Sequence, residues 1–152
     1  MTLAHDPSPM EIALEEARRA QQLGEVPIGA VVAQGRTIVA RAHNETRTGR
    51  DPTAHAEILA IRRAAALLGR DRLGGLDLHA TLEPCPMCAG AIAHARIARL
   101  YFGAEDPKGG GVLHGARVFS HPTCHHVPEI YPGIAEEDCA ALLRGFFQGM
   151  RG

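Results

Sequence analysis

The sequence predicts an α/β fold, a three-layer α/β/α sandwich with a sheet between two layers of helices. Short apolar runs typical of strands alternate along the chain with longer segments of helical periodicity. Neither an internal repeat nor a low-complexity linker interrupts this alternation. The length of 152 residues fits one domain, which we expect to span residues 1–152.

The composition excludes several classes of protein. With 45% hydrophobic and 22% charged residues, the chain is too apolar to be disordered, and it has no collagen or coiled-coil periodicity. The formal net charge of −1 argues against binding nucleic acid through bulk charge, so any RNA contact must be local. Residues Met1–Ser8 show neither the basic nor the apolar region of a signal peptide, and no run approaches the roughly 20 apolar residues of a membrane helix. We therefore expect a cytoplasmic protein that does not contact membranes and whose four cysteines are reduced.

A first helix is predicted to begin after Ser8. Ser8 and Glu11 have the spacing of a capping box, and Pro9 suits the first helical position. Helical spacing predicts one buried face, formed by Met10, Leu14, Ala17 and Gln21.

Two strand-like runs after Gly24 predict a β-hairpin. Pro27–Ala33 and Arg36–Arg41 flank the turn pair Gln34-Gly35. The first run is the more apolar, so we expect it to be the more buried strand.

A second helix is predicted after a polar loop. Thr53 is a candidate cap for a helix that starts at His55 and runs to about Leu68. Its spacing predicts an inner face of Ile58, Ile61 and Ala65.

The next segments continue the alternation of strand and helix. Leu76–Leu82 has the pattern of a central strand, which Pro84 ends. A helix over about Cys85–Ala95 and a strand over Ile97–Phe102 are predicted to follow.

The pattern weakens between Asp106 and Gly133, where glycines, prolines and histidines predict a loop with at most a short strand. That strand would lie around Val118-Phe119 or over Val127–Ile130. The last segment is predicted to be a helix packed on the sheet, with a core-facing stripe of Cys139, Leu142, Leu143, Phe146 and Met150.

Two short motifs carry residue types that bind metals. His55-Ala56-Glu57 is followed further along the chain by Pro84-Cys85-Pro86-Met87-Cys88, which gives the pattern H-x-E…P-C-x-x-C. One imidazole and two thiolates suit Zn²⁺, and two cysteines in one helical turn can bind the same ion. Both cysteines lie near a predicted helix N-terminus, where the helix dipole favours the thiolate.

These motifs supply three ligands, whereas structural zinc sites normally have four. The fourth position would be open to water, which zinc would acidify toward neutral pH, and Glu57 could carry its proton. This pattern favours a hydrolytic site. Three alternatives remain: Cys124, Cys139 or another histidine could complete a structural site, the cysteines could form a redox pair, or a cysteine could be a nucleophile.

The same signature occurs in zinc-dependent deaminases. The chain resembles the cytidine deaminase-like superfamily and, within it, is similar to bacterial tRNA-specific adenosine deaminases, which convert the wobble adenosine of an anticodon to inosine. The resemblance covers nearly the whole chain and is densest over Glu25–Val31, Asp51–Ile58, Thr81–Gly90, Tyr101–Lys108 and Asp138–Phe147. It implies a mixed five-stranded sheet and a homodimer whose tRNA site takes residues from both subunits.

The resemblance also implies the residues of the reaction. His55, Cys85 and Cys88 would bind one Zn²⁺ ion per subunit. Hydroxide on this ion would attack C6 of the adenine, and Glu57 would shuttle the proton and release ammonia.

Four further residues would contact the substrate on the same grounds. Asn44 would hydrogen-bond the base or its ribose, and Ile28 and Ala56 would line the slot for the base. Asp106 would accept a hydrogen bond from the ribose 2′-OH. From the residues alone, Asn44 could instead cap its loop, and Asp106 could form a turn before Pro107.

The resemblance implies the anticodon stem-loop of tRNA as the partner, and the unpaired bases of such a loop are inexpensive to extrude. No nucleotide cofactor is expected, since Lys108–Gly111 lacks the strand-to-helix context of a phosphate-binding loop. Two segments depart from the family pattern: Gly111–Phe119, and Cys124-His125-His126, which is expected to be a loop without a metal. The alternative function is deamination of a free base or nucleoside such as guanine or cytosine.

Overall fold

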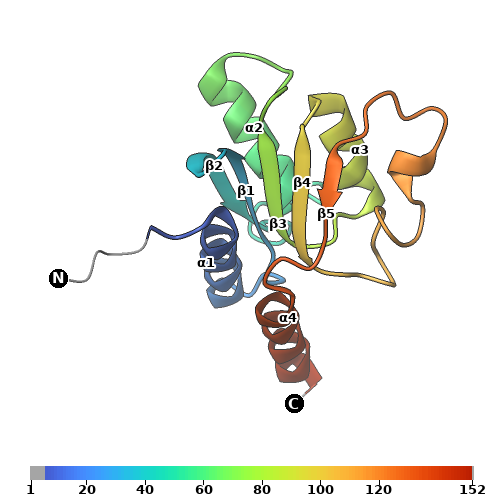
Figure 1. The fold of residues 1–152 in the computed structure, drawn as a ribbon. Coiled ribbons are helices and arrows are strands. Elements are labelled where there is room, and N and C mark those ends of the chain that lie inside the picture. Colours follow the sequence, from blue (N-terminus) through green and yellow to red (C-terminus); the bar gives the residue numbers. More distant parts are fainter. Residues whose placement is uncertain (1–5, 152) are drawn as a thin grey trace.

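The computed structural model describes residues 6–151 (Figure 1). Residues 1–5, which form most of the segment in which no signal peptide is predicted, lie outside the described residues. The elements, in chain order, are α1 (Pro9–Gln22), β1 (Gly29–Gln34), β2 (Thr37–His43), α2 (Ala56–Leu68), β3 (Asp77–Leu82), α3 (Pro86–Ala95), β4 (Arg99–Ala104), a 3₁₀ turn η1 (Val118–Ser120), β5 (Glu129–Tyr131) and α4 (Glu136–Arg151).

The sheet has five strands in the order β2-β1-β3-β4-β5. β1 runs antiparallel to both of its neighbours, β2 and β3. β3, β4 and β5 are parallel to one another. The expected mixed five-stranded sheet is therefore confirmed.

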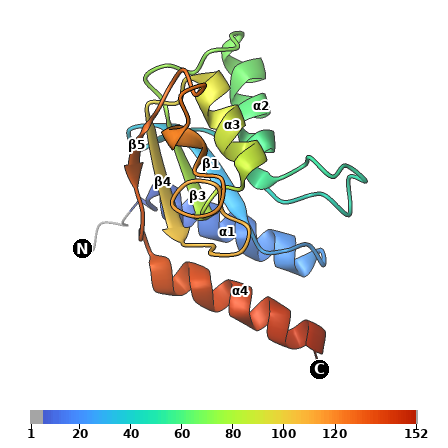
Figure 2. The ribbon, with the colours of Figure 1, turned by 90° about the vertical axis from the view of Figure 1, so that its right-hand side faces the viewer.

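Helices cover both faces of the sheet, as predicted. Figure 2 shows α2 and α3 on one side and α1 and α4 on the other. Val32 and Leu78 point into the core under α2 and α3, whereas Val31 and Ala33 point toward α1. This alternation is the two-residue period of a strand that is buried on both faces.

The core between the sheet and the helices α2 and α3 is unusually rich in alanine. Nearly half of its buried residues are alanines: Ala30, Ala40 and Ala42 on the hairpin, Ala80 on β3, Ala56, Ala60 and Ala64 on α2, and Ala89 and Ala95 on α3. Methyl side chains allow helix and sheet backbones to approach closely. The predicted inner face of α2 is only partly correct. Ile61 and Ala65 are half-buried against this core, but its buried centre is formed by the alanines, and Ile58 is half-buried outside the cluster.

The start of α1 agrees with its sequence signals. Ser8 and Glu11 form the predicted capping box, with Glu11 N–H donating to Ser8 Oγ at 3.2 Å and Ser8 N–H donating to Glu11 Oε2 at 3.3 Å. The prediction for Gln21 was wrong, since this residue is exposed and Ala20 takes the buried position in the last turn. A long polar side chain gains hydration there, whereas a methyl group fits against the sheet.

One further local prediction was wrong. The N-cap of α2 is His55 and not Thr53, whose hydroxyl instead donates to Asp51 Oδ1 at 2.7 Å in a turn. The expected short strand is present, and of its two predicted positions the one over Val127–Ile130 overlaps β5, whereas the segment around Val118 forms the 3₁₀ turn η1.

Only the first half of α4 packs on the core. Cys139 is buried against Gly103 of β4, where a side-chain carbon would overlap its sulfur. Leu142, Leu143 and Phe146 are half-buried, and Met150 is 64% exposed, so the predicted core-facing stripe does not reach the end of the helix. Among the described residues, no helix has the length and apolar character needed to cross a membrane.

Three aromatic rings form a stack across β3, β4 and β5 on the face that α1 and α4 partly cover. His79 stacks on Tyr101 with ring centroids 4.5 Å apart, and Tyr101 stacks on Tyr131 at 4.9 Å. His79 is 8% exposed, and neither of its ring nitrogens has a hydrogen-bond partner. Burial lowers the pKa of His79 to about 4, so the ring is neutral at neutral pH.

This stack predicts that His79→Phe makes the protein more stable, and increasingly so as the pH falls. Phenylalanine retains the stack and removes a buried donor without a partner, which costs about 1–3 kcal/mol. The folded-state pKa of His79 lies below its unfolded value of about 6.5, so histidine loses stability as the pH drops, by about 1 kcal/mol between pH 7.5 and pH 5.5. Urea unfolding of both proteins at the two pH values measures this difference. A difference in the free energy of unfolding between variant and wild type that stays constant with pH would contradict the lowered pKa of His79.

Candidate active site

Three candidate metal-binding side chains meet where the N-termini of α2 and α3 lie side by side. His55 is the N-cap of α2, and Cys85 is the N-cap of α3. Cys88 lies in the first turn of α3 and is fully buried. Pro86 follows Cys85 at the first helical position, where its fixed backbone angle favours starting the helix at this point.

The spacing of the three donor atoms fits a tetrahedral metal. His55 Nδ1 lies 3.5 Å from Cys85 Sγ and 3.4 Å from Cys88 Sγ, and all three donor atoms lie within 4.8 Å of one another. Tetrahedral zinc with usual bond lengths separates nitrogen and sulfur ligands by about 3.5 Å. Within residues 6–151 this is the sole group of three or more His, Cys, Asp or Glu side chains that could hold an ion.

The two cysteines differ in their acidity. A hydrogen bond with Cys88, together with the hydrogen bond to His55, lowers the pKa of Cys85 to about 4. The same sulfur pair and burial raise the pKa of Cys88, while the hydrogen bond to Cys85 raises the pKa of His55. Cys85 is therefore held as a thiolate, which is the form that binds metal.

Glu57 is a buried carboxylate close to this group, since it interacts with His55, Cys85 and Cys88. It lies in the first turn of α2, two residues after His55, and is 4% exposed. Its Oε1 atom is buried and has no hydrogen-bond partner. Burial raises the pKa of Glu57, which favours its protonated form relative to an exposed glutamate.

The residues expected to contact a substrate differ in which of their atoms are free to bind it. Asn44 is 5% exposed, and its side-chain amide makes no hydrogen bond within the described residues, so it does not cap its loop. Asp106 Oδ1 accepts from the N–H groups of Lys108 and Gly109, which forms the turn that the residues alone allowed. Its Oδ2 atom makes no hydrogen bond in the described part of the chain. The side chain of Ala56 is fully buried in the core, so only its backbone, at the open end of α2, is available to a ligand.

A groove of about 840 Å³ contains Ile28 and Asp106. Its remaining walls are Val26, Leu82, Glu105, Lys108, Gly109, Leu143, Phe147 and Met150. The wall from α4 was not predicted as part of the site. Its signal was present in the sequence, because Leu143, Phe147 and Met150 have the spacing of one helix face.

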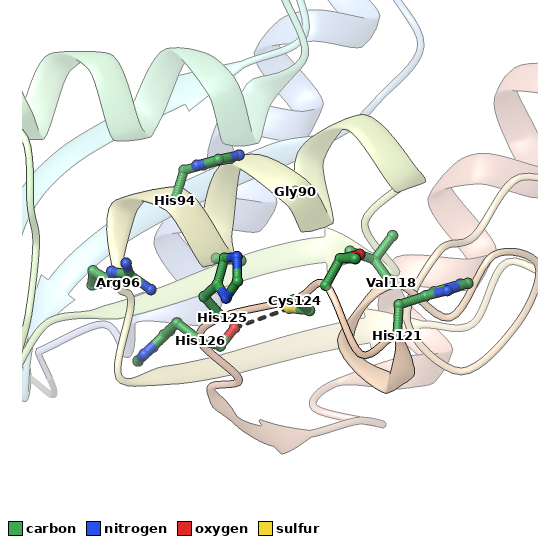
Figure 3. A pocket seen from close by; sticks show the side chains of 10 residues that line it. Gly90, His94, Arg96, Val118, His121, Cys124, His125 and His126 are labelled. Carbon is green, nitrogen blue, oxygen red and sulfur yellow. Dashed lines mark hydrogen bonds between the residues drawn. The ribbon is translucent and has the colours of Figure 1, made fainter.

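A second pocket, of about 280 Å³, lies beside the loop that departs from the family pattern. Figure 3 shows residues that line it, among them His94 of α3, Arg96 at the C-cap of α3, and Cys124 and His125 of the loop. Cys124 Sγ donates to the carbonyl oxygen of His126 at 3.2 Å, so this thiol is engaged within its own loop. Neither Cys124 nor Cys139 lies in the group formed by His55, Cys85 and Cys88. The alternative in which one of these cysteines is the fourth ligand of a structural site is therefore not supported.

The fold and the site together define a deaminase. The model of the MafB19-like deaminase family matches residues 5–151. The tRNA-specific adenosine deaminase of Agrobacterium fabrum is 57% identical over 142 residues, covering 93% of each chain. That of Bacillus subtilis is 45% identical over 144 residues, covering 93% of this chain and 88% of the relative.

Solved structures agree with the sequence relatives. A structure from a study of A-to-I editing by tRNA:A34 deaminases at the wobble position superimposes with a TM-score of 0.87 at 57% identity, covering 89% of this chain and 98% of that chain. The guanine deaminase of Bacillus subtilis is more distant, with 30% identity, a TM-score of 0.62, and coverage of 94% of this chain and 91% of that chain. The chain belongs to the tRNA-specific adenosine deaminase family.

Proposed function

We propose that this protein converts the wobble adenosine of a tRNA anticodon loop to inosine by zinc-dependent hydrolysis. The observation that carries the proposal is the free, buried Oε1 of Glu57 beside the three donors of His55, Cys85 and Cys88. A structural zinc site has no use for a buried acid with an unpaired oxygen at this position, whereas a hydrolytic site requires a proton carrier. The names of the relatives support adenosine in tRNA as the substrate.

The chain's own residues divide the work of the reaction. Zinc bound by His55, Cys85 and Cys88 would supply an acidified water as the nucleophile. Glu57 would move two protons in turn: one from the attacking water to the ring nitrogen N1, and then the remaining hydroxyl proton on C6 to the amino group, which leaves as ammonia. Because its carboxylate is buried, the proton is not lost to bulk solvent between the two transfers.

The surroundings of the site fit one extruded nucleotide and its neighbours. The free amide of Asn44 can hydrogen-bond the base or its ribose, and the backbone at Ala56 and the side chain of Ile28 can line the base slot. Asp106 Oδ2 can accept from the ribose 2′-OH while Oδ1 stays bound in its turn. The groove continues along Leu143 and Phe147, which provides apolar surface for flanking bases.

The names of the relatives favour an anticodon loop over a free base as the substrate. We further propose that the enzyme is a homodimer with one zinc ion per subunit and acts in the cytoplasm, where tRNA is found. Light scattering of the purified protein measures the mass of the assembly.

The direct test is inosine formation on an anticodon stem-loop RNA whose wobble base is adenosine. After incubation with zinc-loaded protein, the RNA is digested and its nucleosides are analysed by mass spectrometry. The proposal expects inosine at the wobble position and no reaction with a stem-loop that has guanosine there. Ammonia release from free guanine or cytosine, with no inosine in the RNA, would replace the proposal with a free-base deaminase.

A further inference from the structure

A buried carboxylate beside the metal-binding residues has no role in the mechanism above. We propose that Glu83 is a positioning residue, which holds the loop 106–114 in the shape that binds RNA. Its effect on activity rests on the proposed function, while its effect on the loop does not. Both carboxylate oxygens of Glu83 accept hydrogen bonds from this loop.

Glu83 accepts four backbone hydrogen bonds from one loop. Its Oε1 atom accepts from Asp106 N–H at 3.0 Å. Its Oε2 atom accepts from three successive N–H groups, those of Val112 at 3.1 Å, Leu113 at 2.9 Å and His114 at 3.0 Å. The carboxylate therefore joins the first residue of the loop to its last three.

These N–H groups are the main compensation for a buried charge. Glu83 lies at the end of β3, and its side chain has no exposed surface. The nearest basic group is His114 Nε2, 3.9 Å away, which is itself bonded to Glu105 at 2.8 Å. Several hydrogen bonds from N–H groups stabilise a carboxylate without any cation. All four donors are satisfied only when both side-chain oxygens accept hydrogen bonds. A glutamine cannot do this, because its amide nitrogen is a donor.

The same loop touches both halves of the site. Asp106 and Gly109 line the groove. Gly110 packs against the Glu83 carboxylate so closely that a side-chain carbon would overlap it. Gly111 packs on Pro86, and its N–H donates to the Pro84 carbonyl at 2.8 Å. The loop thus connects the groove wall to the segment that carries Cys85.

The loop on the other side of the site is held in the same way. Glu25 is fully buried and accepts from Arg47 N–H at 3.1 Å and Thr48 N–H at 2.6 Å, within the loop that joins β2 to α2. Although burial alone raises the pKa of Glu25, the hydrogen bonds from Thr48 and Arg47 lower it overall. Two carboxylates thus hold the two loops that flank the metal-binding group, so the arrangement at Glu83 has a counterpart.

Loss of this support should act on binding and not on the chemical step. If the loop adopts its binding shape only part of the time, the apparent dissociation constant rises by the inverse of that fraction, and a fraction of about one-tenth raises it about tenfold. Once RNA is bound the loop is ordered again, so turnover is retained. The zinc ligands are untouched by the substitution.

The experiment compares zinc-loaded wild type with Glu83→Gln and Glu83→Ala. Hydrogen exchange of the loop amides is measured without RNA, and KM and kcat are measured on the stem-loop RNA. We expect faster exchange confined to residues 106–114, a KM raised about tenfold, a kcat within about threefold of wild type and a full complement of zinc. Glu16→Gln is the matched control, since Glu16 is also buried but bonds Arg41 and Arg19 on the opposite face of the sheet. This control should leave KM and the loop amides unchanged.

Gly110→Ala provides a second route if a Glu83 variant does not fold. Its methyl group would displace the same carboxylate from the loop side, and it should produce the same change in exchange and KM. Loop amides that stay protected in every variant would overturn the proposal. So would a loss confined to kcat with KM unchanged. Absence of inosine with the wild type would refute the proposed function instead, and the exchange data would still decide the role of Glu83.

Discussion

Replacing Glu57 with alanine is expected to abolish inosine formation, lowering kcat by about 10³-fold or more, while zinc stays bound. The three donor atoms come from other side chains, so the ion loses no ligand. The reaction loses the only carboxylate among the described residues that has a buried oxygen without a hydrogen-bond partner. Turnover on stem-loop RNA and zinc content by mass spectrometry measure the two effects separately.

Glu57→Gln sharpens this test because it preserves the shape of the side chain and removes its ability to carry a proton. Both variants should lose the reaction to a similar extent. Activity in Glu57→Gln within tenfold of wild type would show that the carboxylate positions the substrate and does not transfer the proton.

Replacing Cys88 with alanine is expected to remove both zinc and activity. Cys88 supplies one of the three donor atoms and alanine supplies none, so only two protein ligands remain. The loss of zinc affinity should exceed the roughly 10–100-fold that removal of an outer-sphere partner costs. Because bound metal stabilises the folded state, the melting temperature should fall and should no longer respond to added zinc.

Cys124→Ala is the matched control for this change. Cys124 is half-buried and makes its one hydrogen bond within its own loop. The variant should retain zinc, activity and the response of the melting temperature to zinc. Full zinc occupancy in Cys88→Ala, measured under the same conditions, would contradict the ligand assignment.

The parts of the fold that could be predicted are those with local causes. The capping box at Ser8, the break at Pro84 and the alternation of strands with helices each depend on residues a few positions apart. The grouping of His55 with Cys85 was predictable for a related reason, because each motif lies at a helix N-terminus and such termini gather at one edge of an α/β sheet. These features are therefore determined by residues that are close in the sequence.

The parts that could not be predicted depend on contacts between distant segments. Glu83 gave no signal in the sequence, because its four partners are backbone N–H groups that lie 23 to 31 positions further along the chain. The inner face of α2 was misassigned because hydropathy favours Ile58 over Ala60, whereas the close approach of the sheet admits only the smaller residue. Phe147 lines a groove that exists only after α4 has packed against β4.

The alanine core under α2 and α3 has a consequence for the metal-binding residues. His55 belongs to one helix and the two cysteines to the other, so the distance between them depends on how deeply each helix rests on the sheet. Alanine has the smallest side chain of any L-residue, so it allows each helix to lie as close to the sheet as possible. A larger residue at Ala60 or Ala89 would lift one helix relative to the other and stretch a set of donor distances that must match a zinc ion to within about 0.2 Å. The core alanines thus set the distances between His55 and the two cysteines without being ligands themselves. Mutations in this core are therefore expected to impair catalysis although they lie away from the site.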